Sequence, residues 1–393
     1  MSELSPHASI SSLRSTRVGW FELFYDLVVV ASVSYGSKLY IADPTWGMGT
    51  WLFLSLIVLM TFWLLTMVSH NLFPKEDVVR RLLVVVQMMG LVVASLSLVR
   101  SSDGLPDEVG FASLAVSFAS IALVYLRCRR DDSEVVGAAK VLARSTGGAA
   151  LIMVMGFLVA RFVGAAADPY LVWILLLGLA CGILPLLFVV LNRDTTRRLI
   201  DREHLSERMG QLLLIVLGES FIALVFDLSG QASIPNPVYF LIDFAVVFSI
   251  WTIYFTSVFP GGLPRGAGRL RVWIALHCLL MFGAIVAAGT FASLTLLPFG
   301  SDPGTEGFWT PLPLFYVTAA LFGLSILTRS HRVSSRIDAG VVGIMLVLSI
   351  LALWVVPGQA RYLTLIAAAI IVIDAGLSAA IVQRREREGT LSK

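Results

Sequence analysis

Twelve long apolar runs constrain the fold of this chain more than any other feature of its sequence. A helix needs about 20 mostly apolar residues to cross the hydrocarbon core of a bilayer. The chain is 57% hydrophobic and only 14% charged, whereas soluble domains carry about 25% charged residues. The sequence therefore predicts an all-α polytopic membrane protein with about twelve transmembrane helices. The runs are 20–41, 48–69, 80–99, 109–127, 146–165, 170–191, 207–229, 237–258, 270–292, 310–328, 339–356 and 362–383.

The basic residues support the same number of helices. Lys and Arg of membrane proteins collect in the cytoplasmic loops. With the N-terminus inside, all but four of the 29 Lys and Arg residues fall in the inner loops and tails. A missed helix would invert this alternation, and it never inverts. The exceptions are Lys38, Arg100, Arg161 and Arg361. The pattern predicts that both termini are cytoplasmic.

Weak matches recur in the same order along the two halves of the chain. The spacing within each pair lies between 185 and 192 residues: Glu22 and Glu207, Trp63 and Trp251, Gln87 and His277, Met153 and Met345, Tyr170 and Tyr362. These pairs predict two parallel six-helix repeats, related by an axis along the membrane normal. The predicted parts are a tail at 1–19, repeats at 20–191 and 207–383, a cytoplasmic linker at 192–206, and a tail at 384–393.

Two matching acids begin equivalent helices. Glu22 opens the first run, and Glu207 opens the seventh. The macrodipole stabilises a carboxylate at a helix N-terminus by roughly 0.3–1 kcal/mol. Both acids are therefore interpreted in two ways. They are interfacial acids paired with Arg14, Arg17 or a neighbouring helix end, or they lie at the cytoplasmic mouth of a polar path.

The residues that follow these acids differ between the halves. Asp26 lies one helical turn after Glu22, and its counterpart is Gln211. Glu219, near the middle of its run, has Ser34 as its counterpart. A carboxylate at the centre of a membrane helix costs about 2.5–3.5 kcal/mol even on insertion scales. We therefore interpret Asp26 as part of a polar cavity or a buried network. Glu219 is either a group that takes up and releases protons or a protonated acid bonded to a neighbouring helix.

A polar residue occupies the equivalent position in the third and ninth runs. These residues are Gln87 and His277. Histidine titrates near neutral pH and can relay protons, but a lone buried histidine is also a common packing residue. If both residues face a shared interior, they extend the candidate ion-binding or substrate-binding set.

Several other classes of site lack their sequence signals. The three cysteines, Cys128, Cys181 and Cys278, show no metal-ligand spacing. No phosphate-binding glycine loop, metalloprotease motif or nucleophile elbow is present. The net charge of +3 comes from loops that flank the membrane, so we expect no nucleic-acid partner. We expect no metal, no cofactor and no catalytic residue. The expected partners are membrane lipids and a proton, a cation or a small-molecule substrate.

At these residues the chain resembles the bacterial low temperature requirement protein A (LtrA) family. The segment Glu22-Leu23-Phe24-Tyr25-Asp26-Leu27-Val28-Val29-Val30 is close to that family's E-L-F-F-D-L-V-F-V opening. Glu207-Arg208-Met209-Gly210 and Leu217-Gly218-Glu219-Ser220 resemble its E-R-F-G and L-G-E-S segments. After the second run this chain reads Ser69-His70-Asn71, where the family usually has an Arg-Phe-acid cluster. The resemblance implies a multi-pass protein of the bacterial cytoplasmic membrane.

The leading functional hypothesis is a secondary transporter or an ion-translocating protein. Its central path would be lined by the first and seventh helices, with Asp26, Glu219 and His277 as proton or cation sites. Glu22, Glu207 and Gln211 would lie at its cytoplasmic mouth. An alternative is a non-transporting membrane protein of cold or envelope stress adaptation that binds lipid or has a structural role. A membrane-embedded enzyme that uses the same acids is the third. The substrate and the oligomeric state stay open.

Overall fold

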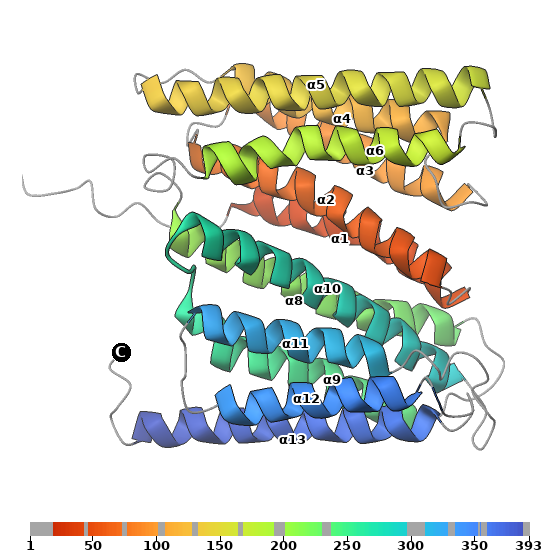
Figure 1. The fold of residues 1–393 in the computed structure, drawn as a ribbon, viewed down its shortest axis with the longest axis vertical. Helices are drawn as coiled ribbons and strands as arrows, with labels where there is room; N and C mark the ends of the chain where they lie inside the picture. Colours follow the sequence, from red (N-terminus) through yellow and green to blue (C-terminus); the bar gives the residue numbers. More distant parts are fainter. Residues whose placement is uncertain are drawn as a thin grey trace, which may run out of the picture.

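A computed structural model describes residues 19–42, 46–72, 77–100, 107–127, 133–163, 168–191, 201–229, 237–296, 311–328, 335–352, 354 and 360–387. Within them the chain forms twelve α-helices and no strand (Figure 1). The first half contains α1 (Trp20–Ala42), α2 (Trp46–Leu72), α3 (Val78–Arg100), α4 (Glu108–Leu126), α5 (Ser133–Val163) and α6 (Asp168–Leu184). The second contains α8 (Arg202–Ser229), α9 (Pro237–Ile253), α10 (Ala267–Leu296), α11 (Pro311–Thr328), α12 (Ser335–Ala352) and α13 (Ala360–Arg387).

Short irregular helices extend two of these elements. The π-helix η2 (Pro185–Val190) continues α6, while the π-helix η3 (Tyr254–Val258) and the 3₁₀-helix η4 (Phe259–Gly261) continue α9. The expected runs 170–191 and 237–258 are therefore α-helical over most of their length, and π-helices form their C-terminal parts.

Most of the helices have the length and the apolar composition of membrane-spanning helices. Among the described residues, nine helices are long and apolar enough to cross a membrane, and they are α2–α6, α9–α11 and α13. The apolar part of α12 is shorter and covers Ala339–Ala352. Helices α1 and α8 carry most of the charged residues discussed below. An all-helical membrane protein is confirmed, while the count of twelve crossings and the orientation of the termini stay predictions.

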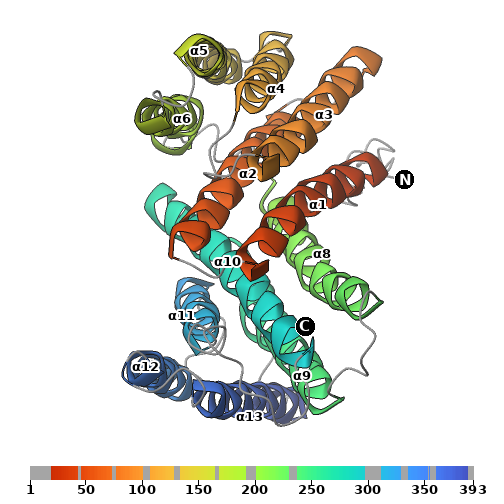
Figure 2. The same cartoon turned by 90° about the vertical axis from the view of Figure 1, so that its right-hand side faces the viewer.

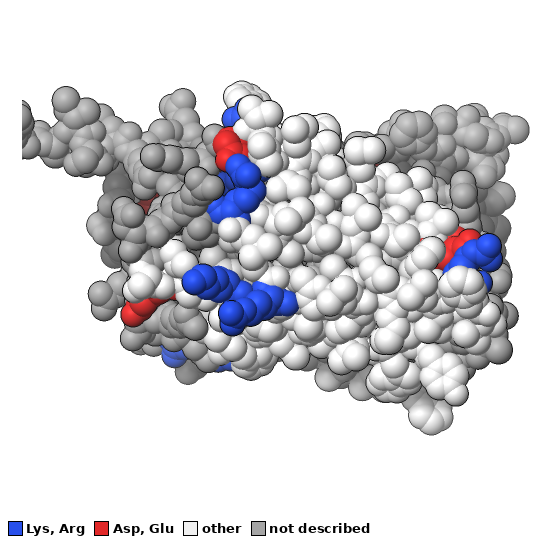
Figure 3. All heavy atoms as spheres, turned by 90° about the horizontal axis from the view of Figure 1, so that it is seen from above, with Lys and Arg blue, Asp and Glu red and all other residues white. Residues whose placement is uncertain are grey.

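Helix α5 is longer than the expected run 146–165. It begins at Ser133, and its first turns contain the exposed Lys140 and Arg144. Its 31 residues would extend about 46 Å, whereas the hydrocarbon core of a bilayer is about 30 Å thick. Figure 3 shows the consequence, because charged side chains gather toward the two ends of this face with a wide uncharged band between them. The apolar run marks the band, and the helix continues beyond it.

Helix α8 also begins earlier than the expected run at 207. The Asp201 carboxylate accepts hydrogen bonds from the backbone N–H groups of Glu203 and His204, at 3.1 Å each. This is the N-cap arrangement that favours helix initiation. The end of the expected linker 192–206 is therefore the first turn of α8.

An acid also fixes the start of α3. The Asp77 carboxylate accepts a 2.7 Å hydrogen bond from the backbone N–H of Arg80 and pairs with the Arg127 guanidinium at 2.8 Å. These two interactions hold the pKa of Asp77 below its usual value. They tie the beginning of α3 to the end of α4.

The two halves pack in the same order of neighbours. In each half the first helix contacts the third, the third the fourth, the fourth the fifth, and the fifth the sixth. Between the halves, α1 contacts α8 and α10, and α2 contacts α10. Figure 2 shows these four helices at the middle of the molecule, with α4–α6 and α12–α13 at opposite ends. The interface between the halves is therefore formed by α1 and α2 of the first half and α8 and α10 of the second.

One glycine determines how closely α3 and α4 approach. A Cβ atom on Gly90 would lie 2.9 Å from the backbone oxygen of Ser113 and would overlap the Ser117 hydroxyl. That hydroxyl bonds the carbonyl oxygens of Ser113 and Gln87, at 2.9 and 3.3 Å. Small residues at helix contacts allow such close packing in membranes.

We expect Gly90→Ala to lower the free energy of unfolding by about 1–3 kcal/mol, because the added methyl group overpacks the contact. Gly147 on α5 is the matched control, since a Cβ there would meet nothing within 4 Å. Gly147→Ala should stabilise the protein by about 0.5–1 kcal/mol, the usual difference between Gly and Ala in a helix. Unfolding in detergent measures both values, and equal effects at the two positions would contradict this packing.

Candidate functional site

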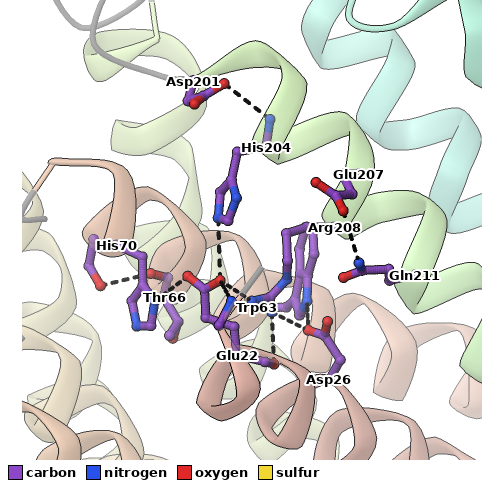
Figure 4. A network of polar contacts seen from close by, with 12 residues as sticks. Glu22, Asp26, Trp63, Thr66, His70, Asp201, His204, Glu207, Arg208 and Gln211 are labelled. Carbon is purple, nitrogen blue, oxygen red and sulfur yellow. Dashed lines mark hydrogen bonds and ion pairs between the residues drawn. The ribbon is translucent and has the colours of Figure 1, made fainter. Parts of the chain in front are cut away.

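A cluster of charged and polar side chains lies where α1 and α2 meet α8 (Figure 4). Each helix contributes residues that are four or seven positions apart, which places them on one helical face. They are Glu22 and Asp26 of α1, Trp63 and His70 of α2, and His204 and Arg208 of α8. The cluster therefore joins the two halves of the chain.

Arg208 is the centre of the cluster. Its side chain is only 2% exposed. Its Nη2 atom lies 2.5 Å from Asp26 Oδ1, and its Nη1 atom lies 3.1 Å from Glu22 Oε2. Nη2 also donates to the backbone oxygen of Glu22 at 3.0 Å. One guanidinium of the second half thus holds two carboxylates and a carbonyl group of the first half.

Glu22 has two further partners. His70 Nδ1 lies 2.7 Å from Oε1, and His204 Nε2 lies 3.4 Å from Oε2. The backbone N–H of Gly19 also donates to Oε2 at 3.1 Å, so the same carboxylate caps the start of α1. Of the partners considered from the sequence, Arg14 and Arg17 lie outside the described residues. The neighbouring helix end is the start of α8.

Asp26 is fully buried. The indole N–H of Trp63 donates to Oδ1 at 2.7 Å, which is the oxygen that also meets Arg208. The other oxygen, Oδ2, has no hydrogen-bond partner among the described residues. Asp26 therefore belongs to a buried network, which is one of the two interpretations of its position, and retains an unused acceptor.

A second buried guanidinium lies next to the cluster. Arg80 is 6% exposed, and its Nη2 atom donates to the hydroxyl of Ser69, the residue before His70, at 3.3 Å. Arg80 and Arg208 together match the charges of the Glu22 and Asp26 carboxylates, which lowers the cost of burying them. Because Asp26 Oδ2 has no hydrogen-bond partner among the described residues, the cluster retains an acceptor for a proton.

Gln87 lies in an adjoining hydrogen-bond network. Its Nε2 atom donates to the Tyr25 hydroxyl at 3.1 Å and to Thr66 Oγ1 at 3.0 Å. Thr66 Oγ1 in turn donates to the Tyr25 hydroxyl at 3.2 Å. Because Tyr25 directly precedes Asp26, this network lies beside the charged cluster.

His277 has an equivalent contact in the second half. Its Nε2 atom lies 3.0 Å from the hydroxyl of Tyr254, and its Nδ1 atom lies 2.8 Å from the backbone oxygen of Trp273. Thr66 and Tyr254 are 188 positions apart, as are Trp63 and Trp251. Gln87 with Thr66 and His277 with Tyr254 are therefore matching pairs. With both ring nitrogens engaged, His277 is held as a packed and hydrogen-bonded residue.

The remaining predicted residues of α8 lie outside the cluster. Gln211 Nε2 donates to Glu207 Oε1 at 3.4 Å, and Glu207 lines a pocket of about 850 Å³. Glu219 is half-buried and has no hydrogen-bond or ion-pair partner among the described residues. It follows Arg208 by eleven residues, or about 16 Å along the helix axis. Of the predicted site residues, the structure brings Glu22 and Asp26 together and leaves Glu219 apart.

Four residues of the cluster were not predicted as site residues. They are Trp63, His70, His204 and Arg208. A signal for two of them exists in the sequence, because His204 and Arg208 have the same four-residue spacing as Glu22 and Asp26. Arg208 also fits the pattern of basic residues that sets topology, so its charge alone does not mark it as a site residue. Among the described residues, no group of three or more His, Cys, Asp or Glu side chains is placed to hold a metal ion.

The apolar helices and the buried charge cluster define a polytopic helical membrane protein. Residues 17–380 match the family model described as bacterial low temperature requirement A protein (LtrA). The chain belongs to the LtrA family, as the resemblance of its motifs implied. Comparison with curated protein sequences finds no significant match.

Proposed function

We propose that this protein is a secondary transporter or ion-translocating protein of the bacterial cytoplasmic membrane. All twelve helices cross the membrane, and both termini are cytoplasmic. The two six-helix halves are parallel repeats that move relative to each other around the α1–α8 interface. The cluster of Glu22, Asp26 and Arg208 binds and releases a proton or a cation during that movement.

Three observations support the architecture in this proposal. The helices of each half follow the same order of contacts. Gln87 and His277 bond equivalent residues of the preceding helix. Helix α1 begins and α13 ends on the same side of the bundle in Figure 1. A parallel repeat with an even number of helices would give this arrangement.

The ion pair between Asp26 and Arg208 is the observation on which the proposed transport function rests. Acids and bases inside membrane helices usually mark ion or substrate pathways. Here the pair joins residues of different halves, and its acid retains an unpaired oxygen. Protonation of Asp26 would weaken its attraction to Arg208 and favour separation of the halves. Such a link between proton binding and movement is what a coupled transporter requires.

The burial of the same cluster favours a second candidate. Asp26 is 0% exposed and Arg208 is 1% exposed. A dry, fully packed network would instead hold together the two halves of a non-transporting membrane protein, such as one that supports the envelope at low temperature. The two proposals differ in whether Asp26 exchanges protons while the protein works.

Reconstitution in liposomes tests the transport proposal. A pH-sensitive dye inside the vesicles reports proton movement while gradients of H⁺, Na⁺ or K⁺ are imposed. We expect the wild type to move protons faster than protein-free liposomes, and Asp26→Asn to reduce this rate at least tenfold. Glu219→Gln, measured in parallel, shows whether the second intramembrane acid takes part.

Glu108→Gln is the control, because Glu108 forms a solvent-exposed pair with Arg161 at 3.5 Å and such pairs contribute little. Its rate should equal that of the wild type. If no gradient produces movement above protein-free liposomes, the transport proposal fails and the non-transporting role stands. If Asp26→Asn moves protons as fast as the wild type, the cluster is not the site.

A further inference from the structure

A pocket lies beside the cluster, because Arg202, Glu203, Ser206 and Glu207 of α8 line it, but it does not belong to the cluster. It has a volume of about 850 Å³, within the range of about 300–1,000 Å³ of small-molecule sites. Its walls are the start of α8, the turn 259–265 after α9, the first turn of α10 and the end of α11. The pocket thus belongs to the second half of the chain alone.

Arginines dominate the charge of this pocket. Arg202, Arg265 and Arg269 line it, against two carboxylates, those of Glu203 and Glu207. Both acids come from α8, whereas Arg265 and Arg269 come from the turn and from α10. The turn and α10 therefore contribute arginines alone, whereas α8 contributes Arg202 together with both acids.

Two of the arginines are close enough to repel each other. Partial burial lowers the pKa of Arg202, and the charge of Arg265 lowers it further. The Arg202 guanidinium also donates to the backbone oxygen of Leu263, which holds it at the wall. Like charges held together in this way are stabilised when an anion lies between them.

The start of α10, which lies between the pocket residues Arg265 and Arg269, adds to the same potential. Helix α10 begins directly after Gly266, whose φ is +96°, and its first turn contains no acid. The N-terminus of a helix carries a partial positive charge and free N–H groups that suit a phosphate. A Cβ atom on Gly262 or Gly266 would meet nothing within 4 Å, so the space beside the turn is open.

We propose that this pocket binds the phosphate group of an anionic ligand between Arg202, Arg265 and Arg269. Arginine is suited to this role because its planar guanidinium donates two parallel hydrogen bonds to phosphate oxygens. The ligand is a phospholipid headgroup or a soluble phosphate ester. This site goes beyond the proposed transport function and does not depend on it.

Binding to the purified full-length protein in detergent tests the proposal. Calorimetry with inorganic phosphate and with glycerol 3-phosphate measures the soluble ligands. Native mass spectrometry with dioleoyl phosphatidylglycerol, compared with dioleoyl phosphatidylcholine, measures retention of an anionic lipid. We expect at least one arm to show saturable binding that weakens as salt rises. Binding of glycerol 3-phosphate identifies a soluble ligand, and selective retention of phosphatidylglycerol alone identifies a headgroup.

Variants that remove positive charge and a variant that removes negative charge distinguish a specific anion site from general electrostatic attraction to the protein. Arg265→Gln with Arg269→Gln should weaken binding at least tenfold, while Glu203→Gln should strengthen it several-fold by removing an opposing charge. Arg144→Gln, an exposed arginine of α5, should leave it unchanged. If the wild type binds none of these probes, or if the double variant binds them as well as the wild type, the proposal is overturned. Thermal unfolding of each variant in detergent verifies that it is folded.

Discussion

Replacing Arg208 with Met should lower the free energy of unfolding by about 3–5 kcal/mol, the cost of breaking a buried ion pair by removing one partner. The loss is large because the guanidinium serves Asp26, Glu22 and the backbone oxygen of Glu22 at once. Without it, the hydrogen bond from Trp63 is the one that Asp26 keeps within the described part of the chain. Chemical unfolding in detergent micelles measures the change.

Two further variants show that the loss comes from the unpaired acids. Asp26→Leu in the Arg208→Met background should recover part of the stability, because it removes a buried carboxylate that has lost its partner. Arg144→Met, an exposed arginine on α5, should change stability by less than about 0.5 kcal/mol. If Arg208→Met is as mild as Arg144→Met, the cluster does not hold the two halves together.

The helical architecture was predictable because a single physical requirement produces it. Each membrane segment must satisfy its own backbone hydrogen bonds, so apolar runs identify helices one at a time. Helix ends were less predictable, since they depend on groups outside the apolar band. Helix α5 continues to Ser133 through residues that no bilayer requires to be apolar, and Asp201 starts α8 before the run begins. Neither the early start of α5 nor the Asp201 cap of α8 changes the hydropathy of the apolar runs, so hydropathy does not reveal these helix ends.

The charged cluster was only partly predictable for a different reason. The cost of a buried acid can be inferred from one helix, and this pointed to Glu22 and Asp26. Their partner lies 182 residues away from Asp26, and the four-residue spacing of His204 and Arg208 does not by itself distinguish Arg208 from an arginine that only sets topology. The role of Glu219 stays a prediction, because depth along a helix does not say which face a residue occupies. It is half-buried, not enclosed.

Asp243 on α9 is a buried acid whose surroundings differ from those of Asp26. It is 0% exposed, and neither carboxylate oxygen has a hydrogen-bond partner among the described residues. A buried polar group without a partner costs about 1–3 kcal/mol. Asp26 has Arg208 and Trp63 as partners, whereas no described residue compensates the buried carboxylate of Asp243.

We therefore expect Asp243→Leu to raise the free energy of unfolding by about 1–3 kcal/mol, because leucine has the same branched skeleton and no polar atoms. Asp243→Asn should give a smaller gain, since its amide stays unpaired. Chemical unfolding in detergent measures both. A loss of stability with leucine would mean that the carboxylate is bonded after all.

Proton movement in liposomes completes the test, because residues that lower stability are commonly retained for function. If the Asp243→Leu variant is more stable than the wild type but moves protons more slowly, Asp243 belongs to the path that ions take through the second half.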